Sequence, residues 1–302
     1  MKNETKKPIT VLSLFDGCSI TRLALSNLDI PCTYYASEVD KQAMKVSAAN
    51  FPDIMQLGDV RSVKGSELPP ITLMTFGSPC QSLSSARIGR TGLDSEDSGL
   101  FYEALRILKE VKPKYFLMEN VKSMAASERD KISKELGVEP IYINSNLLTA
   151  QNRSRLYWTD IPNITQPEDA GIKLQDILNP HSFADREKSC AVMCNSNSYT
   201  RKGLERYLNK SFGQFAFESK STTELSKEDK LTMFDFITDE GKIKENYDMF
   251  FRKLEISELE KLQGMPAGFV GDHVQPTVAH KIIGNAFSEP IIRHILKFAN
   301  LD

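Results

Sequence analysis

The sequence of 302 residues contains no apolar run that approaches the length of a membrane span, and its first eight residues are polar. A membrane-spanning helix needs about 20 consecutive apolar residues, and a secretory signal needs an apolar segment near the N-terminus. Only five cysteines are present, an odd number without disulfide-like spacing. These absences predict a soluble protein without a membrane partner, in a reducing, cytoplasmic setting.

Metal ligands and excess basic charge are also scarce. Cys190 and Cys194 lie near His181, but their spacing fits no common zinc pattern and no second ligand pair exists. We therefore predict that the protein binds no metal. The net charge of -2 excludes a generally basic protein that coats nucleic acid. It leaves room for a local basic face, because partner choice follows the distribution of charge.

The first half of the chain alternates strand-like apolar segments with segments of helical spacing. The expected strands are residues 10–15, 33–37, 54–57, 71–76 and 115–118, and the expected helices lie near residues 23–25, 41–50 and 100–111. Such alternation is typical of an α/β fold with a doubly wound parallel sheet.

The composition changes near residue 162, after which apolar runs become fewer and Ser, Asn and charged residues more frequent. Helical spacing returns at residues 254–262 and 280–301. We predict a first domain at residues 1–164, a small inserted domain at 165–252, and a return of the chain to the first domain at 253–302.

Polar residues follow three of the expected strands. Phe15-Asp16-Gly17 follows the first strand, Glu38 the second and Asp59 the third. Residues at these strand ends lie at the edge where open α/β sheets bind ligands. The glycine lets a ligand approach the backbone, Phe15 can stack on an adenine, Glu38 can bind ribose hydroxyls, and Asp59 can accept a bond from the adenine amino group. Residues 19–22 lack the remaining glycines of a phosphate-binding loop, which favours a nucleoside cofactor without pyrophosphate, S-adenosylmethionine.

A cysteine, a carboxylate and two arginines suggest chemistry at the same edge. Cys80 follows the strand at 71–76 and is either a nucleophile or a buried structural cysteine. Glu119 follows the next strand, and without a histidine partner the pair does not resemble a protease or an amidase. It suits attack of sulfur on a ring carbon whose neighbouring nitrogen is hydrogen-bonded. Arg153 and Arg155 share a face if they lie on a strand, where one could fix a substrate carbonyl; alternatively they are a surface pair.

The inserted segment has a basic half. Residues 181–210 contain six Lys or Arg residues against three acids, beside a Ser- and Asn-rich stretch at 195–200. This composition suits phosphate contacts and hydrogen bonds to base edges, although a merely solvated surface is equally compatible with it.

The motifs occur in the order found in the DNA (cytosine-5)-methyltransferase family, which the chain resembles over nearly its full length. The compact form, with Asp185-Arg186-Glu187-Lys188-Ser189 near the start of the insert, is similar to phage and bacterial members and to the vertebrate de novo enzymes. The motifs that carry the resemblance are Phe15-Asp16-Gly17, Ser37-Glu38-Val39-Asp40, Gly58-Asp59-Val60-Arg61, Ser78-Pro79-Cys80-Gln81, Ser98-Gly99-Leu100-Phe101, Glu119-Asn120-Val121, Gln151 to Arg155, Leu262-Gln263-Gly264-Met265-Pro266 and Gly284-Asn285-Ala286.

The resemblance implies a Rossmann-like, S-adenosylmethionine-dependent methyltransferase sheet with a small inserted target-recognition domain. It implies methyl transfer to carbon 5 of a cytosine that is flipped out of double-stranded DNA. Cys80 adds to carbon 6, Glu119 hydrogen-bonds the ring nitrogen and amino group, Arg155 holds the carbonyl oxygen, and Arg153 supports the nucleophile.

The resemblance also implies two sets of binding residues. The cofactor-binding set is Phe15, Asp16, Gly17, Glu38, Val39, Asp59, Val60, Ser78, Pro79, Leu100, Asn285 and Ala286. The DNA-binding set is Gln81, Ser84, Arg87, Arg90, Lys188, Arg201 and Lys202.

Two other functions remain open at this point. One is a tRNA cytosine-5 methyltransferase, against which the absence of a Cys-Phe-Thr signature argues. The other is a non-catalytic DNA-binding paralogue. Only residues 19–22, which replace the glycine-containing turn usual in the family, favour this second function. As a methyltransferase the protein is expected to be a monomer or weak dimer, nucleoid-associated in the cytoplasm of a bacterial or phage-infected cell, with a restriction enzyme as a partner.

Overall fold

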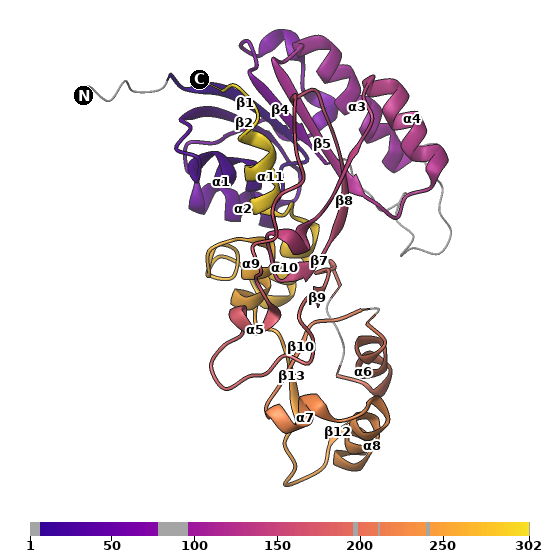
Figure 1. Ribbon diagram of the computed structural model, residues 1–302. Helices are drawn as coiled ribbons and strands as arrows, with labels where there is room; N and C mark the ends of the chain where they lie inside the picture. The colour runs from indigo at the N-terminus through magenta and orange to yellow at the C-terminus, as the bar shows by residue number, and fades with distance from the viewer. Residues whose placement is uncertain (1–6, 78–95, 196–198, 211, 240–241, 302) are drawn as a thin grey trace, which may run out of the picture. The chain divides into compact units, whose positions relative to one another are not determined.

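The computed structural model describes residues 7–77, 96–195, 199–210, 212–239 and 242–301 (Figure 1). By their internal contacts, the residues form two compact units. The first unit comprises Met1–Asn144, Ser154–Pro167 and Ala286–Asp302, and the second comprises Ser145–Arg153 and Glu168–Asn285.

Among its described residues, the first unit contains a seven-stranded sheet with the strand order β3-β2-β1-β4-β5-β8-β6. Strands β1 to β5 pair in parallel, whereas β8 is antiparallel to both β5 and β6. The strand bounds are β1 Ile9–Leu14, β2 Cys32–Ser37, β3 Met55–Gln56, β4 Leu73–Phe76, β5 Tyr115–Val121, β6 Ile141–Asn144 and β8 Ser154–Thr159. The sheet confirms the predicted α/β class.

The strand order reverses beside β1. Strands β2 and β3 continue on one side of β1, and β4 and β5 lie on the other. At such a switch point the connections leave in opposite directions and open a crevice beyond the carboxyl ends of the strands. The candidate ligand-binding residues after β1 therefore lie at the same edge of the sheet as Gly77, where the chain leaves β4.

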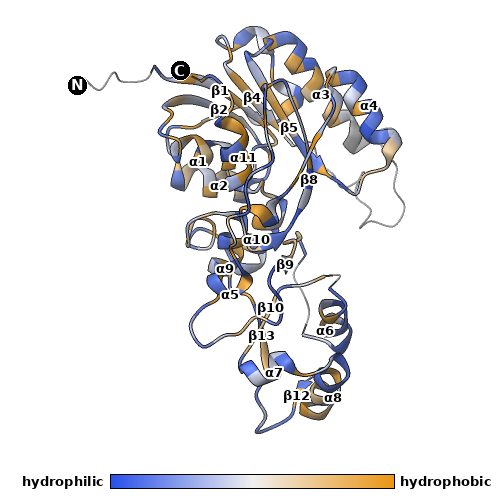
Figure 2. Ribbon diagram, viewed as in Figure 1, coloured by the Kyte–Doolittle hydropathy of each residue, from blue (hydrophilic) through white to orange (hydrophobic). Residues whose placement is uncertain are grey.

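The main core of the first unit lies on one face of the sheet. Leu12 pairs with Met74, which pairs with Phe116, so their side chains form a row on one side of the sheet. Helix α3 (Glu96–Val111) covers this row with Phe101, Ala104 and other buried apolar residues. Figure 2 shows that α3 carries both hydrophobic and hydrophilic residues, as expected for a helix with one buried side.

On the other face of the sheet, helix α1 (Ile20–Ser26) is tied to β4 by buried hydroxyl groups. Thr21 Oγ1 and Thr75 Oγ1 lie 3.1 Å apart, and Thr75 Oγ1 donates to Ser13 Oγ at 3.2 Å. Helix α11 (Glu289–Leu296) contacts α1. The other α-helices described in this unit are α2 (Lys41–Asn50) and α4 (Ala126–Leu136), and its short 3-10 helices are η1 (Val60–Ser62) and η2 (Gly65–Glu67).

The C-terminal segment predicted to be helical at 280–301 contains the end of one helix and the whole of a second one. Helix α10 (Pro276–Asn285) ends before Ala286, and α11 begins at Glu289 with Pro290 in its first turn. Proline has no N–H and clashes with the carbonyl four residues earlier, so it can begin a helix but cannot continue one. Residues 286–288 are consequently the link between the helices.

The second unit is built mainly from short elements around an aromatic core. Phe215, Phe217 and Phe251 from the paired strands β10 and β13 pack with Tyr207 and Phe234 from helices α6 and α8. The bounds of its elements are η4 Ser145–Leu147, β7 Gln151–Asn152, α5 Leu174–Ile177, β9 Ser189–Cys190, α6 Arg201–Leu208, β10 Phe215–Phe217, α7 Lys220–Glu224, α8 Lys227–Ile237, β11 Thr238–Asp239, β12 Lys242–Ile243, β13 Phe251–Lys253, α9 Ile256–Gln263 and α10 Pro276–Asn285.

The unit boundaries differ from the domain boundaries expected from sequence. Helices α9 and α10, which were expected to belong with the first domain, contact each other within the second unit. Residues Ser145–Arg153 also belong to the second unit. The functional division into a catalytic and a target-recognition domain stays a prediction. No helix within the described ranges is long and apolar enough to cross a membrane.

Trp158 offers a test of the core. Its indole is fully buried on β8, and its Nε1 donates to Ser133 Oγ on α4 at 3.0 Å. We expect Trp158→Phe to lower the free energy of unfolding by about 2–3 kcal/mol, because it leaves a cavity and an unpaired buried hydroxyl. Urea unfolding measures this loss. The double variant Trp158→Phe/Ser133→Ala should recover part of it, and no recovery would show that the hydrogen bond is unimportant.

Candidate active site

The loop after β1 has an unusual backbone. Phe15, Gly17 and Ser19 have φ values of 56°, 61° and 64°, in the left-handed region. Gly17 adopts this conformation without a steric penalty, and a Cβ at this position would meet no described atom within 4 Å. Among the described residues, no side chain therefore covers this face of the Gly17 backbone.

Ser19 stands where a phosphate-binding loop would have a glycine, and its side chain compensates for the strained conformation. Its Oγ donates to Asp16 Oδ2 at 2.5 Å and lies 2.6 Å from Ser47 Oγ. Since the single hydroxyl proton of Ser19 goes to Asp16, the second bond has Ser47 as the donor. Tyr34 donates to the other Asp16 oxygen at 2.7 Å.

Asp16 is held in a low-dielectric environment. Burial raises its pKa from 3.8 to about 6, although hydrogen bonds from Ser19, Ser13 and Tyr34 act in the opposite direction. A carboxyl group with such a pKa changes its charge close to physiological pH.

Two further carboxylates lie at the ends of the next strands. Glu38 Oε2 accepts from the Gly17 amide at 2.8 Å, and Oε1 accepts from the amides of Val39 and Asp40 at 2.7 and 2.8 Å. These bonds tie the end of β2 to the loop after β1. Asp59 caps the short helix η1 (Val60–Ser62).

The carboxylate of Asp59 is bound by its neighbour Arg61. The Nε of Arg61 lies 3.0 and 3.1 Å from the two Asp59 oxygens. The hydrogen bonds from the Arg61 side chain and backbone lower the pKa of Asp59 from 3.8 to about 2. Asp59 is therefore a charged acceptor at neutral pH, which is the form that can accept from an amino group.

These groups fit a nucleoside cofactor. The side chains of Phe15 and Leu100 are half-buried and pack against the main core, Val60 is buried, and Val39 is 65% exposed. An open glycine backbone, two fixed carboxylates and flanking apolar groups match the amino, hydroxyl and ring groups of adenosine. Ala286 belongs to the first unit and Asn285, the last residue of α10, to the second.

Two of the predicted catalytic residues, Glu119 and Arg155, contact each other. Glu119 lies within β5, and Arg155 lies opposite Val121 on the antiparallel strand β8. Glu119 and Val121 point to the same side of the sheet, so Glu119 is a diagonal neighbour of Arg155. Arg155 Nε lies 2.7 Å from Glu119 Oε1, and the two side chains are 13% and 12% exposed.

Arg153 does not share a strand with Arg155, a possibility that the sequence left open. It lies between β7 and β8, and its guanidinium donates to the carbonyls of Val192 at 2.9 Å and Gly284 at 3.0 Å within the second unit. The chain passes from the second unit to the first directly after this residue. The change of unit breaks the strand, so the two arginines belong to different local structures.

Several predicted residues are outside the part of the chain that the structure describes. They are Ser78, Pro79, Cys80, Gln81, Ser84, Arg87 and Arg90. Their roles stay predictions.

Lys188 has a structural role that the sequence did not indicate. Its Nζ donates to the carbonyls of Asn146, Thr149 and Ile172 at 2.6, 3.1 and 2.6 Å. An ammonium group has three N–H donors, and these bonds use them all. Its role as a DNA contact stays a prediction. Lys202 is exposed and Arg201 pairs at the surface with Asp235.

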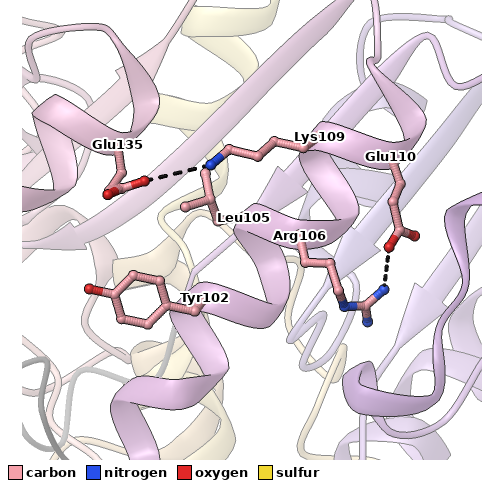
Figure 3. Close-up of a pocket in the computed structure, with 6 residues that line it drawn as sticks. All are labelled: Tyr102, Leu105, Arg106, Lys109, Glu110 and Glu135. Carbon is pink, nitrogen blue, oxygen red and sulfur yellow. Dashed lines mark hydrogen bonds and ion pairs between the residues drawn. The ribbon is translucent and has the colours of Figure 1, made fainter.

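A hollow between α3 and α4 provides no alternative active site. It has a volume of about 560 Å³ and is lined by Tyr102, Leu105, Arg106, Lys109, Glu110 and Glu135. Figure 3 shows that its charged side chains pair with one another, Arg106 with Glu110 and Lys109 with Glu135. Among the residues that the structure describes, no group of three or more His, Cys, Asp or Glu side chains could hold a metal ion.

Comparison with known proteins decides the family. Residues 9–299 match the model of the C-5 cytosine-specific DNA methylases. The chain belongs to this family. It is a DNA cytosine-5 methyltransferase, which transfers a methyl group from S-adenosylmethionine to carbon 5 of cytosine in DNA.

Bacterial methyltransferases are similar to it in sequence. It is 28% identical to Type II methyltransferase M1.ScrFI of Lactococcus lactis subsp. cremoris, over 97% of this chain and 78% of that protein. It is 26% identical to Type II methyltransferase M.Bsp6I of Bacillus sp. (strain RFL6), over 95% of this chain and 97% of that protein.

Solved structures confirm the methyltransferase fold. The Entamoeba histolytica methyltransferase EhMeth superposes with a TM-score of 0.70 at 15% identity, covering 97% of this chain and 98% of that one. The S. pombe Dnmt2 methyltransferase gives a TM-score of 0.63 at 17% identity, covering 96% and 98%.

Sequence reasoning missed the residues that hold the carboxylates of the site. Tyr34, Ser47 and Arg61 bind Asp16, Ser19 and Asp59, respectively. Arg61 was near enough in sequence to be suspected, since it lies two residues after Asp59. Tyr34 and Ser47 gave no local signal, because they reach the loop through the packing of β2 and α2.

The raised pKa of Asp16 predicts a pH dependence. In the unfolded chain an aspartate titrates near pH 4, so a folded pKa of about 6 makes ionisation cost stability in the folded state. The stability that Asp16 contributes to the folded state is fully present below pH 4, and it is lost as the pH rises through 6. Relative to wild type, Asp16→Asn should therefore become more stable between pH 4 and 7 and level off above 7. Urea unfolding at each pH tests this; a constant difference would contradict it. Asp53→Asn, which changes a largely exposed carboxylate, is the control.

The carbonyl contacts of Lys188 predict a loss of stability on substitution. Lys188→Met removes three charge-assisted hydrogen bonds and should lower the free energy of unfolding by about 2–3 kcal/mol. Lys202→Met, on the exposed start of α6, should change it by less than about 0.5 kcal/mol. Thermal melting of both variants measures the difference, and equal melting temperatures would rule out the structural role.

Proposed function

We propose that this methyltransferase acts through a covalent bond between Cys80 and a cytosine flipped out of double-stranded DNA. The observation that supports this most directly is the partly buried pair of Glu119 and Arg155, with Glu119 beside the chain that leaves β4 toward Cys80. A carboxyl group and a guanidinium side by side match the ring nitrogen, amino group and carbonyl oxygen on one edge of cytosine.

Each residue has one role in the reaction. The Cys80 thiolate forms a bond to carbon 6 of the ring, and the displaced electron pair makes carbon 5 nucleophilic. Glu119, as a protonated carboxylic acid, donates its O–H to the ring nitrogen and accepts from the amino group with its other oxygen, while Arg155 donates to the carbonyl oxygen. Both interactions stabilise the negative charge that attack of sulfur places on the ring. Loss of the carbon 5 proton and release of Cys80 then restore the aromatic ring.

The cofactor supplies the methyl group that carbon 5 receives. We place its adenosine among Phe15, Glu38, Val39, Asp59, Val60 and Leu100, with Asp16, Gly17, Ser78, Pro79, Asn285 and Ala286 completing the binding set. The fixed position of Glu38 on three backbone amides supports this assignment, because a pre-positioned carboxylate binds hydroxyl groups without first losing conformational freedom.

The inserted part of the chain is proposed to recognise the DNA. Arg201 and Lys202 at the start of α6 are exposed and could contact phosphates, together with Gln81, Ser84, Arg87 and Arg90. Arg153 is proposed to support the nucleophile from the polar network that holds it. A restriction enzyme is the proposed partner. We further propose a monomer or weak dimer at the bacterial nucleoid.

A trapping experiment tests the covalent mechanism. In duplex DNA containing 5-fluorodeoxycytidine, carbon 5 has no proton to lose, so the enzyme should remain attached in the presence of S-adenosylmethionine. Wild type should give an adduct that survives denaturing gel electrophoresis, and Cys80→Ala should give none. Transfer of a radiolabelled methyl group to unmodified DNA should be lost in Cys80→Ala and fall by about 10²–10⁴-fold in Glu119→Gln.

Cys194→Ala, which removes an exposed thiol, is the control and should behave as wild type. Methylation by Cys80→Ala would overturn the covalent mechanism. Methylation of tRNA without methylation of DNA would overturn the proposed substrate.

A further inference from the structure

Gly77, the last described residue before Cys80, lies against an aromatic ring from the far end of the chain. A Cβ built on Gly77 would lie 2.7 Å from Cε1 and 3.1 Å from Cζ of Phe287. Real Cβ atoms do not approach carbon atoms this closely, so the ring occupies the space that any side chain at residue 77 would need. The φ angle of Gly77 lies outside the left-handed region. The ring of Phe287, and not the backbone conformation, is therefore the obstacle to a side chain there.

The same contact lies beside Glu119. Phe76 pairs with Met118 in the parallel register of β4 and β5. Gly77, directly after β4, and Glu119, within β5, are the residues that follow this pair. The Glu119 carbonyl oxygen lies 3.6 Å from the Cβ position of Gly77. Phe287 thus packs where the two strands that carry the proposed catalytic residues come together.

Helix α11 fixes the position of Phe287. The helix begins two residues later and buries Ile291, Ile292 and Ile295 fully. Glu289 in its first turn is 1% exposed and accepts from Asn27 Nδ2 at 2.9 Å, which joins it to the segment following α1. A ring attached to such a rigid base can restrain the backbone that it contacts.

We propose that Phe287 is a positioning residue for methyl transfer, holding Gly77 beside Glu119 so that the two strand ends keep their catalytic spacing. The proposal rests on the proposed roles of Cys80 and Glu119. Phe287 acts through Gly77, so its loss affects the rate of the chemical step more than the binding of cofactor or DNA. A displacement of about 1 Å at reacting groups can cost on the order of 10²-fold in rate.

Reciprocal substitutions test the contact. Phe287→Leu should lower the single-turnover methylation rate about ten-fold and change the dissociation constant for S-adenosylhomocysteine and the KM for DNA by less than about two-fold. Gly77→Ala should lower the rate further, because its methyl group collides with the ring. Gly77→Ala/Phe287→Leu should be faster than Gly77→Ala alone, because the smaller side chain relieves the collision.

Phe298→Leu is the matched control, since Phe298 follows α11 and packs on His294; it should retain the wild-type rate. Thermal melting checks that each variant is folded, and Phe287→Met replaces Phe287→Leu if the latter is not. Three results would overturn the proposal: a wild-type rate for Gly77→Ala, no recovery in the double variant, or a change in cofactor binding as large as the change in rate. Activity in Cys80→Ala would instead overturn the proposed function.

Discussion

Strands β1 and β4 lie side by side in the sheet, although β2 and β3 separate them along the chain. The loop after β1 and the chain leaving β4 consequently meet at one edge, and the parallel pairing of β4 with β5 brings Glu119 to the same edge. Antiparallel β8 then adds Arg155. Each predicted role depends on this strand order, because residues far apart in sequence become neighbours only where their strands end together.

The carboxylates at this edge are held by the protein's own donors. Asp16 is bound by hydroxyl groups, Glu38 by three backbone amides and Asp59 by a guanidinium. Such contacts fix the acceptors before a ligand arrives, which lowers the entropic cost of binding. Both oxygens of Asp59 are bound by Arg61, just as both oxygens of Glu38 are bound by backbone amides. An amino group that binds Asp59 therefore replaces or shares an existing contact.

In the second unit, long polar side chains bind backbone carbonyls. Its strands are short, so many backbone carbonyls lie in loops without a sheet partner, and buried carbonyls need donors. Long polar side chains provide them: Lys188 binds three carbonyls, Arg153 binds two, and Gln151 donates to the Leu262 carbonyl and to Gln263. A basic residue that the sequence analysis lists as a DNA contact, such as Lys188, can thus also hold backbone segments of the protein together.

The sequence by itself determined the α/β class, most strands of the parallel sheet and the family, because apolar periodicity and short motifs are local properties of the chain. It also named Glu119 and Arg155 as candidate site residues, and the tertiary structure brings their side chains together. The sequence did not show that the last helical segment is interrupted before Pro290, and it left open whether Arg153 and Arg155 share a strand. Only the tertiary structure decided that Lys188 binds carbonyls, that Ser19 is held by Asp16 and Ser47, and that Phe287 packs on Gly77. These contacts join segments separated by up to about two hundred residues, and which side chains meet across such distances is set by packing and not by local sequence.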